Sequence, residues 1–162
     1  MSLTEWPERQ ATLFDGTAAV PHSARVYLPP LDELARIWPA IEKMLMRATS
    51  RTRCYEPIDL LQMAMLGQVG IWVCEVEKKP VAAMVTKIEQ YPRVRVLEML
   101  FCGGTQMKQW LPEAIRAIDW HARASGCQHI ACVGRPGWVR AWGGKPTGDI
   151  IVVRSLGNQT NG

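Results

Sequence analysis

The chain has 162 residues, of which 48% are hydrophobic and 21% are charged. This composition excludes a disordered protein, and the length is typical of a single globular domain with one core. No apolar run approaches the roughly 18 residues needed to cross a bilayer, and the first residues lack the basic and apolar segments of a secretory signal. We therefore expect a cytoplasmic protein with no membrane partner.

The charge and the cysteines exclude further classes. The net charge of +4 comes from basic residues that are scattered along the sequence, so we do not expect nucleic acid as a partner. The cysteines are odd in number, widely spaced and never in C-x-x-C form, which argues against disulfides and against a metal site. They are Cys54, Cys74, Cys102, Cys127 and Cys132.

The two ends of the chain differ from its middle. Residues 1–27 contain Trp6 and Phe14 among turn-forming residues and show no hydrophobic period, which predicts an extended arm. Residues 157–162 form a polar tail, so the domain is expected over residues 28–156. An extended arm needs a surface to dock on, and we expect Trp6 and Phe14 at a protein interface.

Two amphipathic helices open the domain. Apolar residues recur at intervals of three and four from Leu31 to Leu45, and Pro39 is expected to kink or restart this helix. A second helix is expected to begin near Pro57 and to stop at Gly67.

Strands and a long helix follow. Residues 69–76, 81–89 and 94–102 read as three strands joined by short turns, which predicts an antiparallel meander. The start of the next helix has two readings: Thr105 caps a helix that contains Pro112, or Pro112 is the first helical residue. The remaining expected elements are a strand over 129–133, a short helix over 136–142 and a strand over 149–156.

Several short motifs lie along this order of elements. They are Ala82 to Ile88 followed by Tyr91-Pro92-Arg93, then Phe101-Cys102-Gly103-Gly104, Gln109-Trp110-Leu111 and Gly134-Arg135-Pro136-Gly137-Trp138. In element order and in these motifs the chain resembles small GNAT-like proteins, of the N-acetyltransferase fold, that phages and prophages encode. The resemblance covers about residues 31–156. It implies an α/β (α+β) fold in which helices flank a mixed sheet with an antiparallel meander.

The resemblance also implies where acetyl-CoA would bind. GNAT enzymes hold the CoA pyrophosphate with backbone amides of a Q/R-x-x-G-x-G/A loop between the last meander strand and the long helix. That motif is absent here. Gly103, Gly104 and Thr105, with Lys108 nearby, are the candidate cofactor-binding residues if CoA binds. The alternative is a tight strand-to-helix turn that needs a positive φ.

Two acid–base positions follow from the same resemblance. Many GNAT enzymes carry a glutamate base on the strand before the CoA loop, and Glu98 is the candidate here. The alternative is a carboxylate paired with Arg93 or Arg95. The usual acid is a tyrosine four residues before a Gly-Phe pair. Aligning that pair on Gly144-Lys145 puts Arg140 at the tyrosine position, and no tyrosine follows Tyr91.

Other candidate groups are cysteines and tryptophans. Cys102 with His129 or Cys132 would form a nucleophile pair, whereas buried structural cysteines are the commoner case. Trp138 and Trp142 lie among glycines and are candidate interface anchors, with core packing as the alternative. The core or half-core tryptophans are expected to be Trp72, Trp110 and Trp120.

Two functions remain open. The first is a GNAT-fold protein that has lost acetyl-CoA chemistry, needs no cofactor, and acts as a virion-associated or assembly module. It would bind other phage proteins or itself, in the host cytoplasm or in the virion. The second is an active N-acetyltransferase that transfers the acetyl group of acetyl-CoA to an amine, with an atypical CoA loop and Glu98 as general base.

Overall fold

Residues 23–134 and 137–148 are described by the structure, a computed structural model of the chain. Trp6, Phe14, the strand expected over 149–156 and the polar tail lie outside the described residues. In chain order the elements are β1 (Ala24–Tyr27), α2 (Leu31–Thr49), α3 (Pro57–Met65), β2 (Gly70–Val76), β3 (Lys79–Gln90), β4 (Arg95–Gly104), α4 (Met107–Ala124), β5 (His129–Cys132) and α5 (Gly137–Trp142).

The strands form one sheet in the order β1-β2-β3-β4-β5. Strands β1 to β4 pair antiparallel with their neighbours, and β5 pairs parallel to β4. The parallel pair is possible because α4 carries the chain back across the sheet between β4 and β5. The expected mixed sheet with an antiparallel meander is therefore confirmed.

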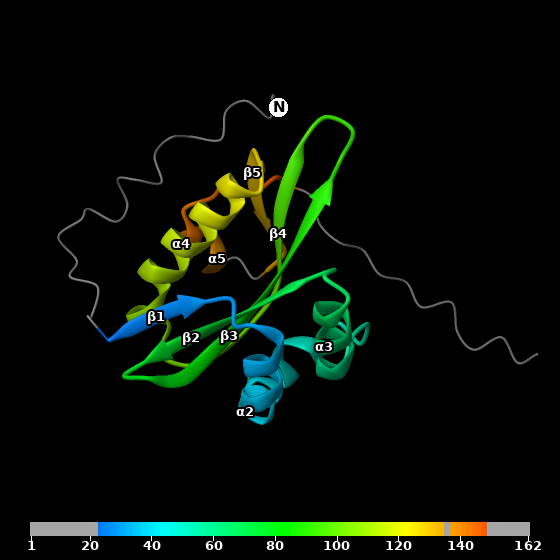
Figure 1. Cartoon of the computed structure of the whole chain (residues 1–162). Helices are drawn as coiled ribbons and strands as arrows, with labels where there is room; N and C mark the ends of the chain where they lie inside the picture. The colour runs from blue at the N-terminus through cyan, green and yellow to red at the C-terminus, as the bar shows by residue number, and fades with distance from the viewer. Residues whose placement is uncertain (1–22, 135–136, 149–162) are drawn as a thin grey trace, which may run out of the picture.

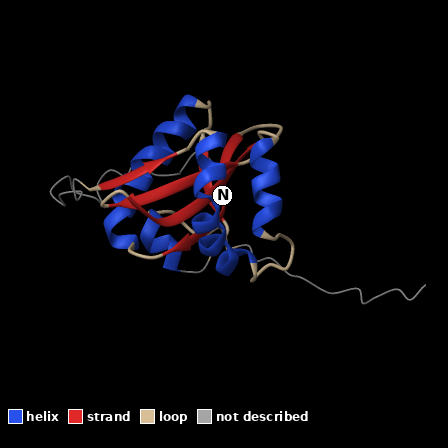
Figure 2. Cartoon of the chain, turned by 60° about the horizontal axis from the view of Figure 1, so that its bottom comes forward, coloured by secondary structure: helices blue, strands red, loops and turns tan. Residues whose placement is uncertain are grey.

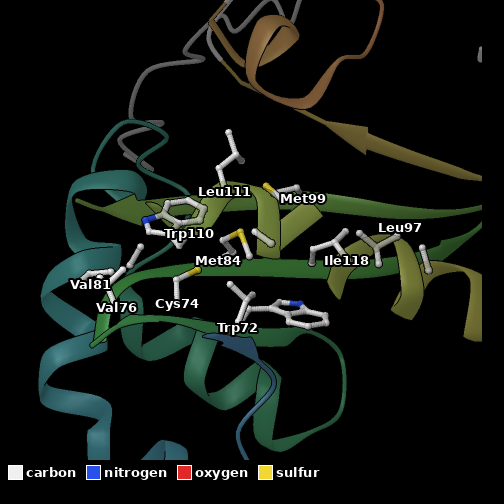
Figure 3. Close-up of a cluster of buried hydrophobic side chains, with 14 residues drawn as sticks. Trp72, Cys74, Val76, Val81, Met84, Leu97, Met99, Trp110, Leu111 and Ile118 are labelled. Carbon is white, nitrogen blue, oxygen red and sulfur yellow. The ribbon is translucent and has the colours of Figure 1, made fainter. Parts of the chain in front are cut away.

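Helices cover both faces of this sheet (Figures 1 and 2). Helices α2 and α3 bury Leu34, Ile41 and Leu60 with one face of the strands. On the other face α4 packs its buried residues against Trp72, which lies with Met84 and Trp110 in the second core cluster (Figure 3). The domain is thus a three-layer arrangement with two hydrophobic cores, and the expected α/β class is confirmed.

Neither internal proline interrupts its helix. Helix α2 runs unbroken through Pro39, and α4 begins five residues before Pro112. Pro39 is exposed, as is Ala35, whose carbonyl loses its helical partner and can bond to water instead. Of the two expected starts of α4, the one before Pro112 is correct, but Thr105 is not the cap. The N-cap residue is Gln106, in a left-handed conformation with φ 58° and without a side-chain hydrogen bond to the helix.

The beginning of the sheet differs from the expectation. Residues 24–27, which the sequence places in the arm, form the edge strand β1 and pair with β2. Four residues are too few to show a period, so the strand exists because β2 offers it an edge. The division of the chain into residues 1–27, 28–156 and 157–162 otherwise stays a prediction.

The tryptophans divide between core and surface. Trp72 and Trp110 are buried, as expected, but Trp120 is 70% exposed, so its assignment to the core was wrong. Trp120 lies two positions beyond the buried Ile118, and two positions turn a helix by about 200°, away from the sheet.

In the described part of the chain, none of the helices combines the length and the apolarity that a membrane span requires.

Candidate functional site

The central feature of the candidate site is the point at which β4 and β5 stop pairing. Their parallel ladder runs from Val96, opposite His129, to Met99, opposite Cys132. Strand β4 continues to Gly104, so its last five residues have no β5 neighbour. On the other side a register shift leaves Leu100 without a partner in β3. Among the described residues, the backbone of β4 beyond Met99 therefore has no strand neighbour on the β5 side.

The turn after β4 is built around two glycines. A Cβ on Gly103 would lie 2.1 Å from the carbonyl oxygen of Met44 in α2, so only glycine allows this close approach. Gly104 has φ +135°, and a Cβ there would lie 2.3 Å from the carbonyl oxygen of Val81. Both candidate cofactor-binding glycines therefore have a packing reason to be glycine.

The connection from β4 to α4 consists of Thr105 and Gln106 alone. The Thr105 amide donates to the Val81 carbonyl at 2.9 Å, and the Thr105 carbonyl accepts from the Trp110 indole N–H at 2.8 Å. These two bonds tie the turn to β3 and to the buried Trp110. A six-residue pyrophosphate loop has no room here, and the Thr105 amide is already occupied.

Lys108 lies in the first turn of α4, and its side chain is exposed. The first turn carries no acidic residue and no side-chain cap. Its amides therefore keep the partial positive charge of a helix N-terminus, to which Lys108 adds a full charge.

The candidate base Glu98 lies on β4 and is half-buried. Its Oε1 accepts a 2.5 Å hydrogen bond from the hydroxyl of Tyr91. The alternative, a pairing with Arg93 or Arg95, is not found: none of the ion pairs among the described residues includes Glu98. Its neighbour in β3 is Lys87.

Lys87 brings a second carboxylate close to this position. Its Nζ lies 2.6 Å from Oε2 of Glu89, and this hydrogen bond is the main reason why the pKa of Lys87 is raised. The hydrogen bond to Glu98 likewise raises the pKa of Tyr91. Tyr91, Lys87 and Glu89 were not selected from the sequence. Strand alternation places 87, 89 and 91 on one face and was the signal that could have found them.

The position that the alignment assigns to the thiolate acid is occupied by Arg140. Arg140 lies exposed on α5, and a guanidinium does not give up its proton in proteins. Gly144 and Lys145 follow in a segment without regular structure. The structure brings no phenol to this side of the sheet from the described residues after Tyr91.

The candidate pair of Cys102 with His129 or Cys132 lacks the lowered thiol pKa that a cysteine nucleophile needs. Burial, with a smaller effect from Cys132, raises the pKa of Cys102 to about 12. Burial also raises the pKa of Cys132. Both sulfurs are therefore protonated thiols at neutral pH, whereas a nucleophile must be a thiolate.

Among the described residues no group of three or more His, Cys, Asp or Glu side chains could hold a metal ion.

Trp138 and Trp142 lie together on α5. Their rings are 6.3 Å apart, both are half-buried, and Trp142 packs against the core under α4. A Cβ on Gly134 would lie 2.4 Å from the Trp138 ring, so this glycine makes room for it. The indole N–H of Trp142 is buried without an acceptor in the described part. Packing within the domain thus accounts for much of the burial of both side chains, and their role as interface anchors stays a prediction.

Comparison with known proteins identifies the fold. No protein-family model and no curated protein matches the chain. Solved structures do match. An aminoglycoside acetyltransferase from an uncultured soil metagenomic sample, in complex with sisomicin, has a TM-score of 0.59 and 12% identity, over 84% of this chain and 96% of that chain.

Two further structures agree. The ribosomal-protein-alanine N-acetyltransferase of Brucella melitensis biovar Abortus has a TM-score of 0.56 and 10% identity, over 82% of this chain and 99% of its own. The enzyme AAC(6')-Iy, solved with a bisubstrate analogue of CoA, has a TM-score of 0.59 and 12% identity, over 82% and 97%. At such low identity the likeness concerns the fold. The chain has the fold of the GNAT-type N-acetyltransferases.

Proposed function

We propose that this chain is a GNAT-fold protein that has lost acetyl-CoA chemistry and acts by binding other proteins. The observation that supports this most is the two-residue connection between β4 and α4. Binding of a pyrophosphate needs several free amides that point at one place. Here the Thr105 amide is used within the protein, and Gly103 and Gly104 are packed against neighbouring backbone. The residues present therefore do not fit the CoA pyrophosphate in the usual way.

The acid position supports the same proposal. Transfer of an acetyl group from a thioester leaves a thiolate, which a nearby acid normally protonates. The alignment puts Arg140 there, and a guanidinium group does not serve as a proton donor in proteins. Of the three parts that the resemblance implies, the pyrophosphate loop and the acid are thus replaced by other residues, and only the base position, Glu98, keeps its residue type.

The setting of this proposal comes from the sequence motifs. They resemble phage and prophage proteins, so the partners that we propose are virion or assembly proteins, or a second copy of this chain, in the host cytoplasm or the particle. Mass spectrometry of purified particles and assembly intermediates tests this setting. Absence of the chain from all of them would rule it out.

A second function keeps one observation in its favour. Glu98 is a half-buried carboxylate held by Tyr91, close to the point where β4 loses its β5 neighbour. In an N-acetyltransferase Glu98 would accept the proton of the attacking amine, and Tyr91 would orient the carboxylate. Acetyl-CoA would be the cofactor, as the CoA-containing analogue bound to AAC(6')-Iy suggests.

Calorimetry with acetyl-CoA distinguishes the two functions. We expect no binding to the full chain at millimolar ligand. Micromolar binding that is lost in Lys108→Glu, and retained in the control Arg123→Glu, would overturn the proposal and support the enzyme. Arg123 is exposed in the last turn of α4, so this control makes the same charge change at the far end of the helix from Lys108.

A further inference from the structure

The solvent face of α2 carries a row of positive charges. Arg36, Lys43 and Arg47 follow one another at intervals of seven and four residues, which places them on one face of the helix. Arg51 continues the row in the turn after the helix, where Thr52 donates a hydrogen bond to the Thr49 carbonyl. All four side chains are exposed. We call these four residues the α2 basic row.

The fold creates this row by turning α2 with its apolar side inward. Leu34, Ile41 and Leu45 are buried on the side that faces the sheet. The three cations on the helix, Arg36, Lys43 and Arg47, lie about 180° away, since the helix turns by about 100° per residue. In the sequence the four residues of the row are spread over sixteen positions, so their alignment is not visible from composition alone.

Among the described residues no acidic side chain forms an ion pair with the row, although Asp32 lies one turn before Arg36 on the same side of the helix. The ion pairs among the described residues involve Arg25, Lys87 and Arg116, and none of the four residues of the row. From residue 43 to residue 53 the chain contains four basic residues and no acidic one. A favourable interaction with the C-terminal end of the helix dipole accounts for Arg47 and Arg51, but not for Arg36 near the other end.

The middle of the row favours a polyphosphate over a protein partner. Stable protein interfaces are centred on a buried apolar or aromatic side chain, surrounded by a polar rim. Between Arg36 and Lys43 the row presents the small, exposed Ala40, and no aromatic residue lies on it. A line of exposed cations with a small residue between them matches a nucleic-acid backbone, and the lack of an aromatic side chain on the row matches a duplex rather than a single strand.

We propose that the α2 basic row binds the phosphate backbone of double-stranded DNA without sequence preference. From Arg36 to Arg47 the helix rises by about 16 Å, close to the axial rise of about five base pairs. Three of the four cations are arginines, whose planar guanidinium groups match the geometry of phosphate. This binding goes beyond the proposed function and is independent of it, since none of these residues belongs to the candidate acetyl-CoA site.

Fluorescence anisotropy with a labelled duplex of random sequence tests the proposal on the full chain. At low salt we expect binding at about micromolar concentration, and a slope of log K against log salt of about −3, because three to four phosphate contacts each contribute about −0.9. The variant Arg36→Gln/Lys43→Gln/Arg47→Gln should weaken binding about ten-fold or more and reduce the slope by about 3. Glutamine preserves helix propensity, and circular dichroism checks the fold.

A matched control separates the effect of the α2 basic row on DNA binding from the effect of net charge. Lys78→Gln/Lys79→Gln/Arg93→Gln removes the same charge from exposed positions in the two hairpin turns, and should change the affinity by less than about three-fold, since these side chains lie off the row. Equal weakening by both triple variants would overturn the proposal, as would a wild-type slope shallower than about −1. Poly-L-glutamate that displaces the duplex at equal charge concentration would also overturn it, because the row would then prefer an acidic protein.

Discussion

The Tyr91 hydroxyl donates a 2.5 Å hydrogen bond to Oε1 of Glu98 across the turn that joins β3 to β4. This contact raises the pKa of Tyr91 for two reasons. The larger is that the carboxylate accepts a hydrogen bond from the protonated phenol, and the smaller is that the negative charge of the carboxylate repels a phenolate. We predict that Glu98→Gln lowers the pKa of Tyr91 toward its ordinary value. An ultraviolet absorbance titration measures it, and Tyr91→Phe identifies the step that belongs to Tyr91.

The matched control for this prediction is Glu89→Gln. Glu89 acts on Tyr91 only through its charge and without a hydrogen bond, so its removal should shift the Tyr91 step much less. Equal shifts in the two variants would mean that the hydrogen bond to Glu98 does not form in solution.

The edge-to-face contact of His121 with Trp72 predicts a pH-dependent stability. The rings lie 5.2 Å apart, and burial lowers the pKa of His121 below 6.5. The unfolded state therefore binds this proton at a higher pH than the folded state does. As the pH falls through 6.5 toward the lowered value, the free energy of unfolding should decrease by at most about 1.4 kcal/mol per pH unit.

Urea denaturation of wild type and His121→Gln at several pH values checks this. The variant should lose this part of the pH dependence, since glutamine does not titrate. Contributions of other groups, such as Asp119, are present in both proteins and cancel in the difference. A difference between the two proteins that stays constant with pH would contradict the prediction.

The close approach of Gly103 to α2 predicts a cost for any side chain at this position. In Gly103→Ala the new Cβ would meet the Met44 carbonyl oxygen, so α2 and β4 must move apart. We expect a loss of about 1–3 kcal/mol in the free energy of unfolding, or more, as for other overpacked sites. Gly137→Ala is the control, because a Cβ there meets nothing within 4 Å. Similar destabilisation by both substitutions would disprove this contact.

The Trp72 indole N–H donates a buried 2.9 Å hydrogen bond to Oγ1 of Thr86. This bond predicts that removal of the acceptor lowers the free energy of unfolding. Thr86→Val keeps the shape of the side chain but leaves the indole donor unsatisfied in the core. We expect a loss of about 1–3 kcal/mol in thermal or urea denaturation. In a double-mutant cycle with Trp72→Phe, Thr86→Val should cost much less, because the donor is then absent. Additive costs would exclude the hydrogen bond as the cause.

Local patterns in the sequence were sufficient for the order of the elements from α2 to α5, but not for β1. The spacing of apolar residues predicts α2 and α4, and Pro57 marks the start of α3, because these signals act over a few neighbouring residues. The burial of Trp72 and Trp110 followed from the same patterns. Trp120 did not, because one residue on a helix can be assigned to a face only when the whole buried stripe is known.

The sequence by itself therefore determined a mixed α/β domain, the missing pyrophosphate motif and the missing tyrosine. Only the tertiary structure decided which distant residues meet: β1 with β2, Tyr91 with Glu98, and Gly103 with Met44. It also decided that β4 extends beyond its pairing with β5 and that the α2 basic row faces solvent. These features depend on strand register and on how a helix is rotated against a sheet. Both are set by packing of the whole domain, which no local pattern encodes.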